Sequence, residues 1–490
     1  MADDADDADD GGTGAAEPSD DLVTTGHRLA DGRAYTATAG RLVLREEVVE
    51  DGTARGHRAR AEVFVVAYTL DGPGGAPQRA RPVVFAFNGG PGSSSVWLHL
   101  GLMGPRRVVM GDAGARTPPP WGLADNAETL LAHADLVFVD PVSTGYSRAV
   151  RGGTPADYHG YRGDLESVAE VVRLWTTRTG RWLSPKYLAG ESYGTLRAAA
   201  LAAHLQRRHG LYVNGVVLVS AVLDMGTIRF TPGNDLPYAL FLPTYAAIAH
   251  HHGRHGDRPL RDVLAEAEEF AAGEYPRALA RGARLPAAER DAVAARLAAL
   301  TGLSGGYVRR VRLRPEHLRF SRELLRDEGR VVGRLDGRFT GWAADDGGER
   351  LEDDPSYDAI QGPYTAALNH YVRAELGYAS DLPYEVLTDR VQPWSYAEFE
   401  GSHVSAAGDL AAAMRQDPHL RVHVAAGYHD GATPYAAAEH VLAHLAVPDE
   451  LRANVEVRHY EAGHMMYVHE PSRRQQSADL AAFVTARPAP

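Results

Sequence analysis

The stretch Gly190-Glu191-Ser192-Tyr193-Gly194 places a serine between two glycines, in the pattern G-x-S-x-G. In this pattern the serine occupies a sharp turn from a strand into a helix, with its hydroxyl exposed at the carboxyl end of a sheet. The flanks fit, because Lys186 to Ala189 has the composition of a short strand and Thr195 to His209, rich in Ala, Leu and Arg, that of a helix. We therefore predict a nucleophilic Ser192, with the positive end of the helix beside the place where an oxyanion would form. The five residues alone fit an ordinary glycine-rich turn equally well.

An aspartate and a histidine each follow a later predicted strand. Asp430 comes after the apolar run Leu420 to Ala426, and His464 comes after Val455 to Tyr460. The chain order Ser192, Asp430, His464 is the order of α/β-hydrolases. In such a triad His464 takes the Ser192 proton, while Asp430 fixes the imidazole tautomer and stabilises the imidazolium. A single histidine at a strand end is usually a polar loop residue, but the order, the turn and a glycine-rich loop together favour the triad.

The glycine-rich loop follows the continuous apolar run Pro82 to Phe87. The run predicts a buried parallel strand, and the loop after it is Asn88-Gly89-Gly90-Pro91-Gly92-Ser93-Ser94-Ser95. Such a loop can cradle a phosphate, but the lysine of a P-loop is missing and no G-x-G-x-x-G spacing follows. We favour an oxyanion loop, because glycines between a strand and the first helix of a hydrolase sheet present bare N–H groups.

Further strands and helices alternate around the serine. Apolar runs at Asp135 to Asp140 and Val213 to Leu223 predict buried strands, and Arg162 to Thr179 carries apolar residues at helical spacing. This alternation predicts an α/β fold with a mostly parallel central sheet flanked by helices. Near the N-terminus, Arg33 to Val48 and Ala61 to Leu70 alternate apolar and polar residues, which predicts half-buried antiparallel strands at an edge of the sheet.

The predicted core is interrupted by a long insertion. Residues 26–224 and 394–490 are predicted to form the two parts of an α/β-hydrolase core, and residues 225–393 the insertion. The insertion contains helical stretches such as Leu260 to Ala271 and Ala287 to Leu300, and no clear buried strand. Because strands resume after it, we predict a large helical cap over the carboxyl edge of the sheet, where loops build the site. An unrelated second domain is the alternative.

Composition disfavours several partners and compartments. The 490 residues carry a net charge of −13, which disfavours nucleic acid or an anionic membrane as the main partner. Part of this charge is local: Met1 to Asp21 holds nine acids and no base, and we predict that residues 1–25 are a disordered acidic tail. No apolar run has the length of a membrane span, and the N-terminus lacks the basic and apolar regions of a signal peptide. The chain as written is therefore predicted to be cytoplasmic, although a wrongly assigned start would hide a leader.

No metal and no other cofactor is predicted. The chain has no cysteine, so it forms no disulfide and has no thiol nucleophile. His250-His251-His252 and the nearby His255 have side chains that can bind a metal ion, but we favour a solvated helix end for them.

Four blocks of the sequence resemble the signature blocks of the serine carboxypeptidase family, in the family's order and with its large insertion before the aspartate block. They are Asn88-Gly89-Gly90-Pro91-Gly92-Ser93-Ser94, Gly190-Glu191-Ser192-Tyr193-Gly194, Ala426-Gly427-Tyr428-His429-Asp430 and Ala462-Gly463-His464-Met465. The resemblance implies an α/β-hydrolase fold with Ser192, Asp430 and His464 as the triad. It also implies that the N–H groups of Gly90 and Tyr193 form the oxyanion hole.

The same resemblance implies a site for the C-terminus of a peptide. Asn88, Gly89 and Glu191 would hold the substrate's C-terminal carboxylate, and Met465 would help to line the pocket of the leaving residue. We therefore predict a serine-type carboxypeptidase that removes C-terminal residues from peptides through a Ser192 acyl-enzyme. An esterase or acyltransferase on the same fold is the alternative, and a non-catalytic peptide-binding protein is disfavoured by the intact triad. The side-chain preference and the oligomeric state are not determined by the sequence.

The sequence also departs from the family pattern. The resemblance covers nearly everything from about Ala34 onward, but Ser93 stands where the family often has a cysteine. A second glutamate that recognises the carboxylate usually precedes the Gly-Pro pair, and here Leu102 and Met103 precede Gly104-Pro105. This departure weakens the prediction of carboxylate binding more than it weakens the prediction of the triad. Most relatives are also secreted.

Overall fold

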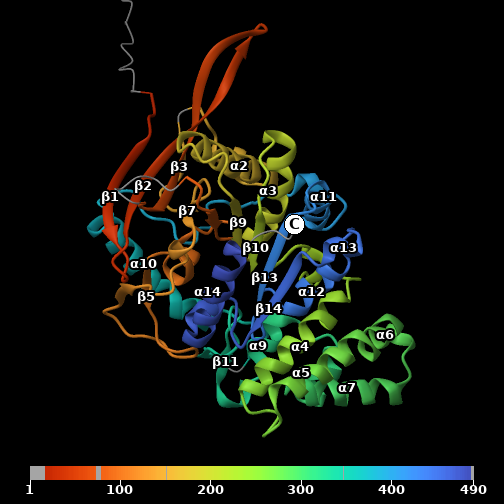
Figure 1. Cartoon of the computed structure of the whole chain (residues 1–490). Coiled ribbons are helices and arrows are strands. Elements are labelled where there is room, and N and C mark those ends of the chain that lie inside the picture. The colour runs from red at the N-terminus through yellow and green to blue at the C-terminus, as the bar shows by residue number, and fades with distance from the viewer. Residues whose placement is uncertain (1–16, 73–78, 151, 346, 487–490) are drawn as a thin grey trace, which may run out of the picture.

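The computed structural model describes residues 17–72, 79–150, 152–345 and 347–486 of the chain. In these residues ten strands form one sheet in the order β1-β2-β3-β7-β4-β9-β10-β13-β14, with β8 paired to β3 outside that path. The strands from β7 to β14 in this order are parallel, and β1, β2 and β3 are antiparallel to their neighbours. The prediction of an α/β fold with a mostly parallel sheet flanked by helices is confirmed (Figure 1).

The strands of the central sheet are β1 (Asp21–Arg28), β2 (Ala34–Glu50), β3 (Thr53–Leu70), β4 (Val83–Phe87), β7 (Asp135–Val139), β8 (Arg148–Ala149), β9 (Lys186–Glu191), β10 (Gly215–Val219), β13 (Arg421–Gly427) and β14 (Val455–Tyr460). Two small hairpins lie outside it, one of β5 (Arg106–Val109) and β6 (Gly122–Asp125), the other of β11 (Arg330–Val332) and β12 (Thr340–Trp342). Strands β4, β7 and β10 are buried along their whole length. They are continuous apolar runs because helices cover both faces of the parallel sheet.

Helices on the two faces belong to two apolar core clusters. The first cluster joins the sheet to α2 (Tyr161–Arg178), α3 (Tyr193–His209), α11 (Ala407–Gln416) and α12 (Tyr435–Ala443), and the short α13 (Asp449–Arg452) packs beside it. The second cluster joins the sheet to α1 (Val96–Leu98), α10 (Pro355–Ala374) and α14 (Glu470–Thr485). Within the described residues we find no helix with the length and apolar character that a membrane crossing requires.

The insertion predicted over residues 225–393 has two parts. The first part is a helical lobe, visible at the lower right of Figure 1, with its own apolar core around Phe241 and Tyr245. Its helices are α4 (Leu236–His251), α5 (Leu260–Ala272), α6 (Glu274–Arg281), α7 (Ala287–Thr301), α8 (Gly305–Arg310) and α9 (His317–Glu323). Helix α10 instead packs against the sheet, where Tyr371 is fully buried in the second core cluster. Residues 225–393 therefore contain both a helical lobe and a helix that packs with the sheet, a difference that an apolar stripe alone does not show.

The predicted acidic tail also ends earlier than expected. Residues 1–16 lie outside the described residues, but residues 21–25 form the first part of β1 and pair with β2. An Asp20 carboxylate oxygen accepts a backbone N–H bond from β2 at 2.9 Å, and Asp21 accepts a hydrogen bond from the Tyr378 hydroxyl at 3.0 Å. For these residues the prediction of disorder is wrong, because the edge of β2 supplies the hydrogen bonds that acidic composition alone did not indicate.

Candidate active site

Ser192 lies at the turn from β9 into α3, with φ 59° and ψ −129°. A positive φ is unusual for a residue with a side chain, and this strained strand-to-helix turn is the geometry of a nucleophile elbow. The turn is so tight that a Cβ on Gly190 would lie 2.0 Å from the carbonyl oxygen of Gly194. The backbone therefore requires glycine at position 190 and places Ser192 at the carboxyl end of β9.

Two backbone N–H groups beside Ser192 are available to an oxyanion. A Cβ on Gly89 would lie 2.4 Å from the backbone nitrogen of Tyr193, so the glycine loop after β4 touches the turn. Gly90 follows with φ 100°. In the described part of the chain, neither the Gly90 N–H nor the Tyr193 N–H donates to a backbone acceptor. Tyr193 is also the first residue of α3, whose N-terminal end carries a partial positive charge.

A buried ion pair contacts the backbone of the glycine loop. Arg197, on the inner face of α3, donates to both carboxylate oxygens of Asp164 on α2 at 2.7 and 3.1 Å. A third N–H of Arg197 donates to the backbone carbonyl of Asn88 at 2.7 Å. The Arg197 side chain is only 1% exposed, so the pair is shielded from water. Sequence reasoning missed both residues, although a charged residue within an Ala- and Leu-rich helix was a usable signal.

His464 and Asp430 form a direct hydrogen bond of 2.8 Å between Nδ1 and Oδ2. Asp430 also accepts hydrogen bonds from the backbone N–H of Ala432 and of Thr433, and from the Thr433 hydroxyl, at 2.8 to 2.9 Å. Burial acts to lower the pKa of His464, but the charge and hydrogen bond of Asp430 outweigh it and hold the pKa above its ordinary value. Asp430 can therefore fix the imidazole tautomer and stabilise the imidazolium.

Ser192 and His464 are each held by a hydrogen bond to one of two consecutive residues at the end of β10, Val219 and Ser220. The Ser192 N–H donates to the Val219 carbonyl at 3.0 Å, and the Ser220 hydroxyl donates to the His464 carbonyl at 2.6 Å. Both side chains belong to the described residues, and Ser192 Oγ makes no hydrogen bond to His464 Nε2 in the structure. Such a bond is often long in a site without substrate and shortens in the complex.

Glu191, next to the serine, has a carboxyl group enclosed by the protein. It is 3% exposed, and its Oε2 accepts a hydrogen bond from the Tyr467 hydroxyl at 2.7 Å. Burial raises the pKa of Glu191 to about 7, against the opposing effects of His464 and Tyr467. Nearby, the side-chain nitrogen Nδ2 of Asn88 is buried and makes no hydrogen bond of ordinary length, but Asn88 is close enough to the Glu191 carboxyl to oppose the rise of its pKa; Asn88 Oδ1 accepts from the Leu98 N–H. The predicted group of Asn88, Gly89 and Glu191 is therefore brought together, with a donor and a carboxyl both available.

The side chain expected to supply a second carboxyl is replaced by apolar and aromatic groups. Leu102 is 1% exposed in the second core cluster. A Cβ on the neighbouring Gly101 would lie 2.3 Å from the Tyr467 ring and 2.7 Å from the Tyr364 hydroxyl, so two tyrosines pack here. Met465 is also buried in this cluster, directly after His464. Sequence reasoning missed Tyr467, which lies 276 residues from its partner Glu191.

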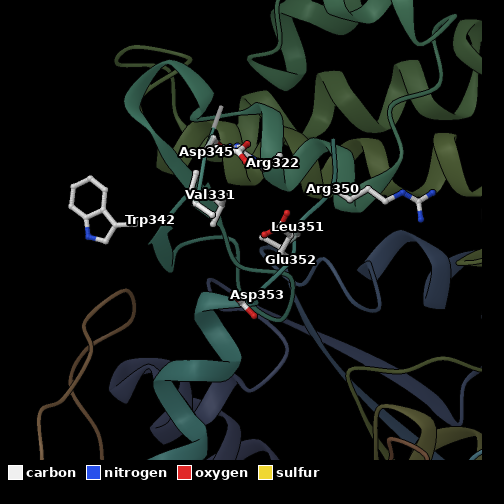
Figure 2. A pocket seen from close by; sticks show the side chains of 10 residues that line it. Arg322, Val331, Trp342, Asp345, Arg350, Leu351, Glu352 and Asp353 are labelled. Atoms are coloured by element: carbon white, nitrogen blue, oxygen red, sulfur yellow. Dashed lines mark hydrogen bonds and ion pairs between the residues drawn. The ribbon is translucent and has the colours of Figure 1, made fainter. Parts of the chain in front are cut away.

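A cavity of about 470 Å³ opens beside Ser192 between the core and the helical lobe. The core contributes the serine, Gly90 and Tyr193, and the lobe contributes Phe241 and His317. A second pocket, of about 250 Å³, lies at the β11–β12 hairpin and contains none of the predicted site residues (Figure 2). There Trp342 is 79% exposed and points away from the other labelled side chains. The cavity beside Ser192 is therefore the candidate active site.

The histidines at the end of α4 use ring nitrogens to bond backbone carbonyls. His250 and His252 contact the carbonyls of Arg258 and Gly337, both at 2.7 Å, and His255 contacts that of Ala299 at 3.1 Å. Across the described residues, no three or more His, Asp or Glu side chains are grouped so that they could hold a metal ion.

Comparison with known proteins adds to this geometry. A family model described as serine carboxypeptidase matches residues 72–225. The pheromone-processing carboxypeptidase KEX1 of Yarrowia lipolytica is 30% identical over 173 residues, which are 33% of this chain and 24% of that protein. The solved structure of a prohormone-processing carboxypeptidase from Saccharomyces cerevisiae aligns over 92% of this chain and 90% of that chain, with a TM-score of 0.54 and 14% identity. A proline iminopeptidase from Mycobacterium smegmatis aligns over 90% and 97% of the two chains, with a TM-score of 0.35 and 13% identity.

These similarities differ in what they bear on. The family match contains the glycine loop and the Ser192 turn, whereas Asp430 and His464 lie beyond it. The alignment with the Yarrowia protein spans about a quarter of that protein's length, 24%. The Saccharomyces structure, at 14% identity, bears on the fold alone. The segment of residues 72–225 is therefore similar to the serine carboxypeptidase family, and the chain as a whole has the α/β-hydrolase fold.

Proposed function

We propose that the protein is a serine carboxypeptidase that hydrolyses the last peptide bond of its substrates. Ser192 Oγ attacks the carbonyl carbon while His464 takes the hydroxyl proton, and the N–H groups of Gly90 and Tyr193 bind the oxyanion. The C–N bond then breaks, His464 gives the proton to the leaving amine, and the last residue departs. Water, deprotonated by His464, attacks the Ser192 ester and releases the shortened peptide. Asp430 holds the imidazole throughout.

The carboxyl group of Glu191 is the observation that supports an exopeptidase rather than a general acyl hydrolase. It is buried beside Ser192, and burial raises its pKa to about 7. A substrate carboxylate brought against Glu191 would share one proton with it, because two like charges at contact distance in a dry site do not both remain ionised. The Asn88 Nδ2, which is buried beside the Glu191 carboxyl, would add a donor to the same carboxylate. Together these groups would recognise a free C-terminus.

Mass spectrometry of a mixed peptide digest tests this function directly. The proposal expects residues to leave one at a time from the C-terminus, and amidated peptides to be cleaved with kcat/KM lower by about 10-fold, through loss of a charge-assisted hydrogen bond. Only the lower end of the usual range is expected, because Leu102 replaces a second carboxyl group. Equal cleavage of free and amidated peptides would contradict the proposal.

An esterase or acyltransferase is the second candidate, and the buried Leu102 is what favours it. Without a second carboxyl group, the site has fewer contacts that distinguish a free C-terminus from an ester. Small N-acyl amino-acid esters and free-acid peptides with the same acyl residue separate the two functions. A kcat/KM for esters far above that for peptides, together with indifference to a C-terminal carboxylate, would favour the esterase.

A further inference from the structure

The cavity beside Ser192 lies on the acyl side of the bond that is cleaved, and this inference rests on the proposed function. Of the described residues, the cavity lining includes Ser192 and Gly90 but not Glu191, Met465 or Tyr467. Since Glu191 would bind the C-terminal carboxylate, the leaving residue lies on the Glu191 side of the serine. The cavity therefore holds the side chain of the residue that supplies the scissile carbonyl, one place before the C-terminus.

The charged side chains of this cavity are mostly cationic. Arg229 is exposed, and its guanidinium makes no hydrogen bond or ion pair with any described residue. Arg334 is 44% exposed, with its Nε 3.8 Å from Asp354. Among the described residues that line the cavity, Glu316 is the acidic one, and it is already paired with Arg350 at 2.8 Å. The guanidinium of Arg229 thus has no ion-pair partner among the described residues, and that of Arg334 has one distant partner.

His317 adds unpaired hydrogen-bonding groups to the same cavity. It is 5% exposed, and neither ring nitrogen has a hydrogen-bond partner. The ring packs on the loop that carries Asp430, since a Cβ on Gly431 would lie 2.2 Å from His317 Cε1. Burial lowers the pKa of His317 to about 3, so the imidazole is neutral and has one N–H donor. Buried polar groups are normally paired, and a polar ligand atom would pair this one.

We infer that this cavity selects an acidic side chain, Asp or Glu, in the residue before the C-terminus of the substrate. Arg229 and Arg334 supply the opposite charge, and the His317 N–H supplies a hydrogen bond to the carboxylate. Apolar lining residues such as Met225 and Phe230 contact the methylene groups. Complementary charge of this kind gives specificity by rejecting side chains of the wrong sign as well as by attracting the right one.

The test is a series of N-acylated dipeptides, X-Leu, with X = Glu, Gln, Leu or Lys and a free C-terminus. Glu and Gln have nearly the same shape, so their ratio of kcat/KM isolates the effect of charge. We expect Glu to exceed Gln by about 10-fold and Lys by about 100-fold, as for hydrogen bonds to charged groups. A kcat/KM for Gln or Lys equal to that for Glu would overturn the inference.

Variants assign the preference to residues. Arg229→Gln and Arg334→Gln are each expected to lower the Glu/Gln ratio severalfold, Arg229→Lys to retain part of it, and the double variant Arg229→Glu/Arg334→Glu to prefer Lys over Glu. Arg290→Gln is the matched control, because Arg290 is an exposed arginine of α7 that does not line the cavity. Each ratio is measured within one preparation, so a smaller fraction of folded enzyme cancels. Unchanged ratios in the Arg229 and Arg334 variants would overturn the assignment.

The proposed function and this inference can fail separately. If X-Leu peptides are cleaved but X has no effect, the carboxypeptidase stands and the selectivity is wrong. If free-acid peptides are not cleaved, N-acyl-Glu and N-acyl-Gln methyl esters present the same acyl side chain without a C-terminal carboxylate. A Glu preference among the esters would support the inference without the carboxypeptidase, whereas no turnover of either class would overturn both.

Discussion

Three side chains carry the proposed bond chemistry, and their removal is the most direct prediction at the scale of the residue. Ser192→Ala, His464→Ala and Asp430→Ala are each expected to lower kcat by several powers of ten, because nucleophile, base and orienting carboxylate act as a unit. A fluorophosphonate probe should label Ser192. Ser402→Ala is the matched control, since Ser402 is exposed and outside the cavity. Full activity of the Ser192→Ala protein would eliminate the triad.

At the same scale, Glu191 is expected to make peptide binding depend on pH. Burial raises the pKa of Glu191 to about 7, so the group is protonated below that pH and can share its proton with the substrate's carboxylate. As the pH rises through about 7 the proton is lost and two negative charges face each other, so KM for free-acid peptides should increase. The chemical step requires a neutral His464, whose pKa is raised, and therefore favours the higher pH. KM and kcat measured from pH 5 to 9 should show both trends.

The Glu191→Gln variant separates the role of Glu191 from that of the triad. Glutamine keeps a neutral hydrogen-bonding group in nearly the same shape, so KM for free-acid peptides should become nearly independent of pH while kcat keeps its dependence on His464. Ester substrates have no carboxylate and should show a flat KM with either protein. The same steep rise in KM in the variant would mean that Glu191 does not bind the carboxylate.

At the scale of the element, the ion pair between α2 and α3 positions the glycine loop. Asp164→Ala leaves a buried arginine unpaired and is expected to destabilise the fold by about 3–5 kcal/mol, measured by urea unfolding. Because Arg197 also bonds the Asn88 carbonyl, kcat should fall as well. The double variant Asp164→Leu/Arg197→Met should recover most of the stability, since a buried pair is often replaceable by apolar groups, but it still lacks the bond to Asn88. Recovery of kcat along with stability would show that the pair has no role in positioning the loop.

The sequence predicted those elements whose burial can be recognised from their local amino-acid composition. Strands β4, β7 and β10 were found because a strand covered on both faces is an unbroken apolar run. Helix α10 lies within the insertion predicted over residues 225–393, and an apolar stripe does not identify the surface that such a helix meets. The bonds from Arg197 to Asp164 and from Tyr467 to Glu191 join residues 33 and 276 positions apart, and no local pattern encodes such pairings.

At the scale of the whole molecule, the core and the insertion contribute different parts of the candidate site. Ser192, Gly90 and the Asp430–His464 pair come from the sheet's loops, in motifs that the sequence made visible. The cavity residues His317 and Arg334 come from the insertion, and neither belongs to a recognisable motif. The candidate catalytic residues were therefore predictable from short patterns, whereas the inferred selectivity depends on how the insertion meets the core.

Strand β1 has a consequence for the solution behaviour of shortened forms of the protein. Its eight residues pair with Ala34 to Arg41 and so cover the hydrogen-bonding edge of the first eight residues of the 17-residue strand β2. Deleting residues 1–16 leaves this cover in place and should not change the oligomeric state in solution. Deleting residues 1–28 exposes the backbone groups of β2, and an open sheet edge of this kind pairs with other chains. Light scattering should then show self-association that grows with protein concentration. A shortened protein with the molar mass of a single chain would show that β1 is not needed to prevent pairing at the edge of the sheet.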